Sequence, residues 1–258
     1  CKNCNTELEN NKNYCFECGA KVITERLTFK GICAEVSTKF FNLDNKLLNT
    51  FFDLFTKPDV VIVDFINGTR KKHVNVIQYF AIALTLVGIQ VFLMNTFFED
   101  SMNLDALFGK DNYSKDNPFS PENFNYSEIN NYQSLIYVLS VPLSAFSTWF
   151  AYYIIADRRY NFTEHIVINL YYSAQIIIIT SLLSILFLCF GLNYLIISSF
   201  ITVITVIYLF FILHKVFKTK RTESISRFIL VMLIYAFFFF GIIICSAVYG
   251  LLMTKIGG

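Results

Sequence analysis

Four cysteines near the start of the chain form two Cys-x-x-Cys pairs, Cys1 with Cys4 and Cys15 with Cys18. Ten residues separate the pairs, which is a spacing that lets four thiolates converge on one zinc ion with tetrahedral geometry. The residues between the pairs are rich in Asn, Glu and Lys and too polar to form a core of their own. The pattern therefore predicts a Cys4 zinc ribbon over residues 1–24, folded by its metal.

Two other interpretations of the cysteine pairs are two disulfides and a redox pair of the thioredoxin type. Disulfides need an oxidising compartment, and a thioredoxin-type pair needs one Cys-x-x-Cys on a βαβ scaffold, which this stretch lacks. Gly19 after the second pair and Asn5 after the first both tolerate the left-handed backbone of a zinc knuckle. Four cysteine ligands leave no position for a catalytic water, so we expect a structural zinc and a reduced, cytosolic N-terminus.

The composition of the chain indicates a membrane protein. Of its 258 residues, 55% are hydrophobic and 16% are charged, whereas about 25% are charged in soluble domains. Apolar segments longer than the roughly 18 residues that a spanning helix needs recur five times. They cover residues 74–98, 132–155, 166–190, 192–216 and 228–253. The fold class predicted is an all-α polytopic membrane protein, with a five-span helical bundle over residues 73–258.

The charges of the connecting segments predict how the bundle is oriented. Lys and Arg concentrate before the first span and in the second and fourth connections, whereas the first connection, residues 99–131, is acidic. By the positive-inside rule the N-terminus is cytosolic, and the loop 99–131 and the C-terminus are external. A net charge of only +2 provides no basic field for nucleic acid, so we expect membrane lipids and not nucleic acid as partners.

Residues 25–72 connect the ribbon to the first span. Apolar residues recur there at spacings of three and four, at Val36, Phe40, Leu43, Leu47, Phe51 and Leu54. This periodicity predicts a cytosolic amphipathic helix, and Pro58 can start a second short helix that Asn67 and Gly68 end. The two helices either lie in the membrane interface over the cytosolic end of the bundle or pack as ordinary helices, and the periodicity favours neither.

A candidate polar site lies between the second and third spans, at the cytosolic interface. Its residues are Arg158, Arg159, Glu164, His165, Asn169 and Tyr172, near Asp157. In a functional interpretation the two arginines bind a lipid phosphate, and His165 orients it or moves a proton. In the structural interpretation the charges set the topology and the segment caps the third span.

Sequence motifs of catalysis are absent. No Asp, Glu, Lys, Arg or His lies near the middle of a predicted span, which disfavours an ion-coupled pump. The chain has no Ser-His-Asp order, no Gly-rich phosphate loop and no His-Glu-x-x-His motif. We therefore expect a protein that is not an enzyme.

The stretches CKNC…CFECGA, RLTFKGI, FTKPDVVIVDFINGTRKK and YNFTEHIVINLYYSAQ follow one another in an order that is similar to a known family. The chain resembles a bacterial domain-of-unknown-function family of zinc-ribbon multi-pass membrane proteins over nearly its whole length. The zinc ribbon together with Pro58, Gly68 and Arg70 carries most of this resemblance, and Glu164 and His165 look like the family's Glu-His pair. Where that family has a proline before the first span, this chain has Val-Asn-Val. The resemblance implies a location in the bacterial inner membrane, and it assigns no activity because the family's role is not established. The five-span topology is more loosely similar to the Yip-type trafficking proteins.

Three functions are consistent with these features. The first is a non-enzymatic adaptor or scaffold that docks partners, including a cytosolic protein, through the zinc ribbon. The second is a lipid-handling or small-solute permeation protein, and the third, least supported, is an intramembrane enzyme. A wide, water-lined cavity that converges on Asn169 and Gln175 would favour the second function, and a dry, filled bundle would favour the first.

Overall fold

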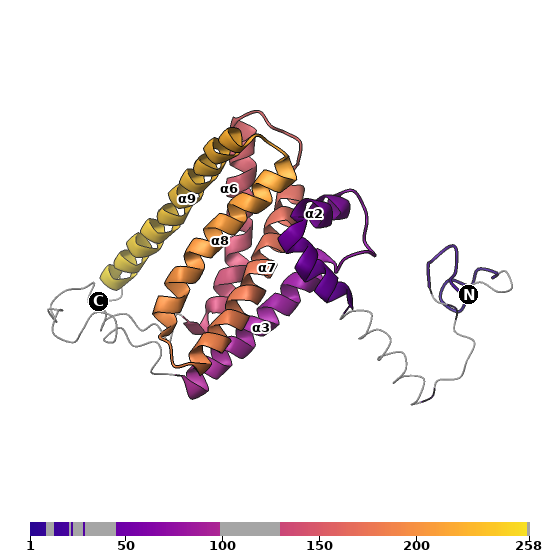
Figure 1. Ribbon diagram of the computed structural model, residues 1–258, viewed down its shortest axis with the longest axis horizontal. Helices are drawn as coiled ribbons and strands as arrows, with labels where there is room; N and C mark the ends of the chain where they lie inside the picture. The colour runs from indigo at the N-terminus through magenta and orange to yellow at the C-terminus, as the bar shows by residue number, and fades with distance from the viewer. Residues whose placement is uncertain (9–12, 21, 23–27, 29–44, 99–129, 257–258) are drawn as a thin grey trace. The chain divides into compact units, whose positions relative to one another are not determined.

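The computed structural model describes residues 1–8, 13–20, 22, 28, 45–98 and 130–256. It divides into two compact units, Cys1–Asn45 and Lys46–Gly258 (Figure 1). The first half of the predicted amphipathic helix and most of the predicted external loop 99–131 lie outside the described residues.

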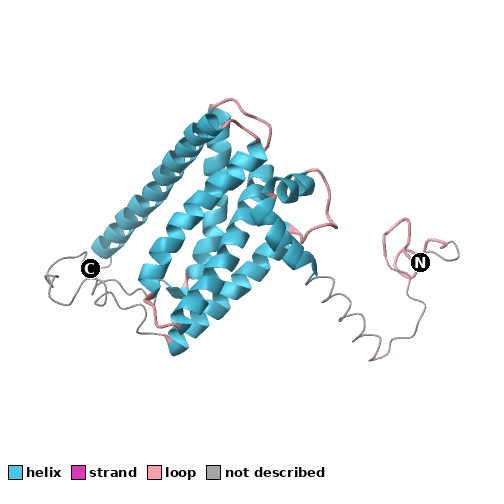
Figure 2. Cartoon of the chain, in the orientation of Figure 1, coloured by secondary structure: helices cyan, strands magenta, loops and turns pink. Residues whose placement is uncertain are grey.

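The described part of the N-terminal unit consists of loops and turns, with an isolated bridge at Tyr14 (Figure 2). The N–H of Cys15 donates to the Ala20 carbonyl at 2.8 Å, and the N–H of Val22 donates to the Asn13 carbonyl at 2.9 Å. These two bonds close a tight loop around the second cysteine pair.

The larger unit contains five helices that are long and apolar enough to cross a membrane. They are α3 (Val76–Phe97), α6 (Gln133–Ile154), α7 (Phe162–Cys189), α8 (Tyr194–Phe217) and α9 (Arg221–Ile256). The predicted class, a five-span helical bundle with an N-terminal cluster of four cysteines, is confirmed. The third and fifth helices begin earlier than the apolar segments do, because polar first turns precede their spans.

The helix α7 is the centre of the bundle (Figure 1). It packs against α3, α6 and α8, and α9 packs against both α6 and α8. The outward faces of these helices are apolar: the side chains of Ile77, Phe200 and Phe237 are about 70% exposed. Such surfaces are suited to contact with lipid tails and not with water.

Two short helical segments lie against the spans. Residues 45–56 are helical, and α2 (Pro58–Ile66) follows after one residue, with Pro58 in its first turn. Thr50, Leu54 and Val61 are completely buried, and α2 packs against α7 and α8. In their described part these helices therefore pack against the spans, and their position in the membrane interface stays a prediction.

Candidate metal centre and membrane-domain sites

The sulfur atoms of Cys1, Cys4, Cys15 and Cys18 all lie within 4.8 Å of one another. The Cys1 and Cys18 Sγ atoms are 3.7 Å apart, and those of Cys4 and Cys15 are 3.6 Å apart. A disulfide would bring two sulfurs to about 2.05 Å, whereas zinc–sulfur bonds of about 2.3 Å in a tetrahedron place the sulfurs roughly 3.8 Å apart. The four cysteines are thus free thiols that could hold a metal ion.

Each cysteine pair lies on a backbone turn of its own, and the two turns are of the same type. The N–H of Asn5 donates to the Cys1 carbonyl at 2.8 Å, and the N–H of Gly19 donates to the Cys15 carbonyl at 2.9 Å. Asn5 and Gly19 both have the left-handed backbone expected after a knuckle, with φ of 58° and 68°. The two turns therefore aim four sulfur atoms at one point.

Thr6 favours the thiolate form of Cys4, one of the four clustered cysteines. Its hydroxyl lies 3.1 Å from the Cys4 sulfur. Hydrogen bonds from the Thr6 side chain and backbone lower the pKa of Cys4 to about 7. Because the thiolate is the form that binds metals, this contact prepares Cys4 as a ligand near neutral pH.

Two aromatic residues project from the second pair. The Cys15 side chain is buried, but its neighbours Tyr14 and Phe16 are 61% and 69% exposed. The loop that buries the ligand thus turns both flanking rings outward within the N-terminal unit.

At the candidate polar site Asp157 is the centre of an ion-pair network. Arg159 donates to both of its carboxylate oxygens, at 2.9 and 2.5 Å, and to the Phe217 carbonyl at 2.6 Å. Arg227 of α9 pairs with the same carboxylate. The hydrogen bonds from Arg159 hold the pKa of Asp157 well below its usual range. Arg159 therefore joins the α6–α7 turn to the end of α8, and Asp157 joins the same turn to α9 through Arg227.

Two further candidates lie apart from this network. The Glu164 side chain accepts from the Asn161 N–H at 2.6 Å while Asn161 accepts from the Glu164 N–H, forming a capping box at the start of α7. Arg158 is exposed, and its guanidinium lies 4.6 Å from the centre of the Tyr153 ring. Glu164 thus has the capping role of the structural interpretation.

The remaining candidates, His165, Asn169 and Tyr172, face the interior of the bundle. His165 Nδ1 lies 3.1 Å from the Thr148 hydroxyl, and Asn169 Nδ2 donates to the same hydroxyl at 2.9 Å. Tyr172 instead donates to the Thr205 carbonyl of α8 at 3.1 Å. The structure brings His165 and Asn169 together, but it does not gather the six candidates into one site.

The bundle is filled around Asn169 and Gln175, both of which are completely buried. Gln175 accepts a hydrogen bond from Tyr79 and donates to the Phe51 carbonyl at 3.1 Å. Neither amide lines the cavity described next, and because that cavity lies within the same bundle, the bundle is not filled throughout.

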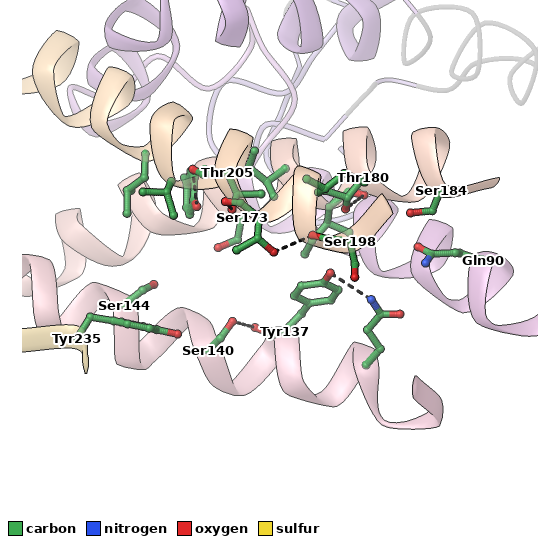
Figure 3. Close-up of a pocket in the computed structure, with 18 of the residues that line it drawn as sticks. Gln90, Tyr137, Ser140, Ser144, Ser173, Thr180, Ser184, Ser198, Thr205 and Tyr235 are labelled. Carbon is green, nitrogen blue, oxygen red and sulfur yellow. Dashed lines mark hydrogen bonds between the residues drawn. The ribbon is translucent and has the colours of Figure 1, made fainter. Parts of the chain in front are cut away.

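A cavity of about 500 Å³ lies elsewhere, between α6, α7, α8 and α9 with one residue from α3. Figure 3 shows Ser140 and Ser144 on α6 and, across the cavity, Ser173 on α7 and Ser198 on α8. Its volume falls within the roughly 300–1,000 Å³ of small-molecule sites. Of the sequence-predicted residues only Tyr172 lines it.

Comparison with known proteins gives one match. A family model described as "Protein of unknown function (DUF3667)" matches residues 44–88. The matched segment contains the helical residues 45–56, α2 and the first half of α3. No curated protein and no solved structure matches the chain. The chain is thus a multi-pass membrane protein with a short region similar to a family of unknown function.

Proposed function

We propose that the chain is a membrane adaptor whose N-terminal unit folds around one structural zinc ion and docks a protein partner. Four thiolates fill the tetrahedral coordination sphere of zinc, so the ion would have no open position for a substrate or water. Such a centre stabilises a small fold and supplies no chemistry. A binding role, and not a catalytic one, fits it best.

The exposed rings of Tyr14 and Phe16 carry this proposal. They are large apolar surfaces held on a short loop that the neighbouring ligand Cys15 would tie to the metal. Exposed aromatic anchors on a rigid support are typical of residues that dominate protein interfaces. A metal-clamped loop also costs little conformational entropy on binding.

The five-span unit would serve as the anchor in the bacterial inner membrane. The positive-inside rule and the reduced thiols both support a cytosolic N-terminal unit, because the basic connections and the thiols then share one side. The apolar outer faces of the spans contact lipid tails, and the exposed Arg158 is suited to lipid headgroups.

Crosslinked purification of the full-length chain from its native membrane tests the docking role. We compare the natural chain with the double variant Tyr14→Ser, Phe16→Ser and with Glu17→Ser, which changes an exposed residue of the same loop. All three keep the four cysteines, so each is expected to retain one zinc ion. A partner protein should be recovered with the natural chain and with Glu17→Ser, and at least fivefold less with the double variant. Recovery of the same proteins in equal amounts from all three would contradict the docking surface.

A further inference from the structure

The walls of the cavity between α6, α7, α8 and α9 are uncharged, with hydroxyl and amide groups set in a surface that is mainly apolar. More than half of its lining residues carry a hydroxyl group, and Gln90 and Gln133 add amides near one end. No Asp, Glu, Lys, Arg or His lines it among the described residues. Without a counterion, a buried phosphate or carboxylate in this space would be strongly unfavourable. The walls therefore select against anions.

Half of the lining hydroxyl groups use their proton on a backbone carbonyl and keep only their acceptor positions. A hydroxyl has one proton and two acceptor positions. Ser140 donates its proton to the Tyr137 carbonyl at 2.9 Å, and Ser144 donates to the Val141 carbonyl at 3.0 Å. Four more lining hydroxyls also donate their proton to a backbone carbonyl: those of Tyr172, Thr180, Thr202 and Thr205. The lone pairs that remain can accept hydrogen bonds from a ligand.

An amide adds a further acceptor to this lining. Gln133 uses its Nε2 group to donate to the hydroxyls of Tyr137 and Tyr194, each at 3.3 Å. Its Oε1 atom is buried and has no hydrogen-bond partner among the residues that the structure describes. A buried acceptor without a donor costs free energy, and a ligand hydroxyl would remove that cost.

Aliphatic side chains complete the walls. They are Ile176, Ile177, Ile201, Val206, Leu209, Val231 and Met232. These residues can contact hydrocarbon, while the hydroxyls and amides accept hydrogen bonds from a polar end. We propose that the cavity binds an uncharged amphiphile that carries hydroxyl groups on its polar end and a hydrocarbon chain. This function is distinct from docking by the N-terminal unit.

Binding of radiolabelled 1-octanoylglycerol to the full chain in phosphatidylcholine nanodiscs tests the proposal, with empty nanodiscs as background. This probe has two hydroxyl donors, one acyl chain and no charge. Saturable binding is expected, with at least tenfold weaker competition by its 3-phosphate, which adds charge to the same molecule. Glycerol alone should also compete at least tenfold more weakly, because it lacks the chain. Absence of saturable binding, or equal competition by either compound, would overturn the proposal.

Two adjacent serines of α8 provide a matched pair of variants. Ser198 lines the cavity, whereas Ser199 is exposed on the outside of the helix. Ser198→Leu should weaken binding of 1-octanoylglycerol at least fivefold, and Ser199→Leu should not change it. If Ser198→Leu does not fold, Thr180→Val, which removes a lining hydroxyl and keeps the side-chain shape, should weaken binding at least threefold. Unchanged affinity in the folded cavity variant would refute the assignment.

Discussion

At the scale of single residues, the hydroxyl of Thr148 has one proton and three polar neighbours. It donates to the Ala145 carbonyl at 3.0 Å, so it must act as the acceptor for Asn169 and His165. His165 Nδ1 then carries a proton, and a neutral ring leaves Nε2 as an acceptor. One threonine thus satisfies donors from two residues of α7 in the interior of the bundle.

Replacing Thr148 by Val tests this arrangement because the two side chains have nearly the same shape. The variant leaves donors of His165 and Asn169 without their acceptor and should lower the free energy of unfolding by about 1–3 kcal/mol. Ser147→Ala is the control, since the buried Ser147 hydroxyl donates only within its own helix, to the Leu143 carbonyl. Thermal unfolding in detergent gives the comparison, and equal losses in both variants would argue against the shared acceptor.

Asp157 makes the stability of the bundle depend on pH. Arg159 lowers the pKa of this carboxyl in the folded chain below the unfolded value of about 3.9. The ionised group therefore stabilises the fold at neutral pH, and this contribution is lost as the pH falls toward the folded-state pKa. Asp157→Asn should cost about 1–3 kcal/mol at pH 7.

The difference in Tm between the natural chain and Asp157→Asn should accordingly be largest near pH 7. It should shrink once the pH falls below about 4, where the unfolded carboxyl is protonated. Asp59→Asn is the control, because Asp59 lies 4.0 Å from the exposed Lys218 and such pairs contribute about 0–1 kcal/mol. A difference that does not change between pH 7 and pH 3 would contradict the role of the charge.

At the scale of elements, the end of the helical segment 45–56 is held by side chains of the spans. The last carbonyls of a helix have no partner within it. Here Tyr208 of α8 donates to the Leu54 carbonyl in the last turn at 3.0 Å, and Gln175 of α7 donates to the Phe51 carbonyl, which lies before the last turn, at 3.1 Å. The N–H of Val74 also donates to the Thr50 hydroxyl at 3.0 Å. Hydrogen bonds as well as apolar contacts thus join this segment to the bundle.

Tyr208→Phe removes the hydrogen bond to the Leu54 carbonyl without changing the ring. The lost hydrogen bond contributes about 1 kcal/mol, so its removal should raise the equilibrium constant for local opening of residues 45–56 roughly fivefold. Amide hydrogen exchange followed by mass spectrometry measures this opening peptide by peptide. Tyr153→Phe, at an exposed ring of α6, should leave exchange in this segment unchanged. If both variants behave like the natural chain, this hydrogen bond does not hold the helix.

Most of the elements could be predicted from sequence because their signals are local. The lengths of the apolar runs determine the five spans, and Pro58 and Gly68 mark the second short helix. The side on which the short helices pack could not be predicted, since it depends on tertiary partners such as Tyr208 and Gln175. The cysteine cluster was predictable because the ligands lie in two close pairs.

The cavity was not predictable from sequence in the same way. Ser140 and Ser144 are four residues apart, a spacing equally typical of closely packed spans, and only the positions of α7, α8 and α9 leave space beside them. Arg227 was missed because its partner Asp157 is distant in the chain. Both features depend on contacts between elements, which periodicity does not encode.

At the scale of the whole molecule, the charge asymmetry and the alternating spans predict one orientation. An epitope inserted after Leu192, in the exposed α7–α8 turn, should be reached by antibody in intact spheroplasts. An epitope after Lys71, in the exposed segment before α3, should be reached only after permeabilisation. Labelling of the second epitope in intact spheroplasts would mean that the topology is the reverse of the predicted one. The cysteines would then lie on the oxidising side.

The proposed docking loop would be rigid only with a metal bound, so the adaptor function requires the four thiolates to hold one structural zinc ion. Elemental analysis of the full-length chain purified under reducing conditions, without added metal, tests it most directly. We predict one zinc ion per natural chain and at least a tenfold lower content in Cys15→Ser. Less than a tenth of an equivalent of zinc in the natural chain, or an equal content in both, would contradict the claim.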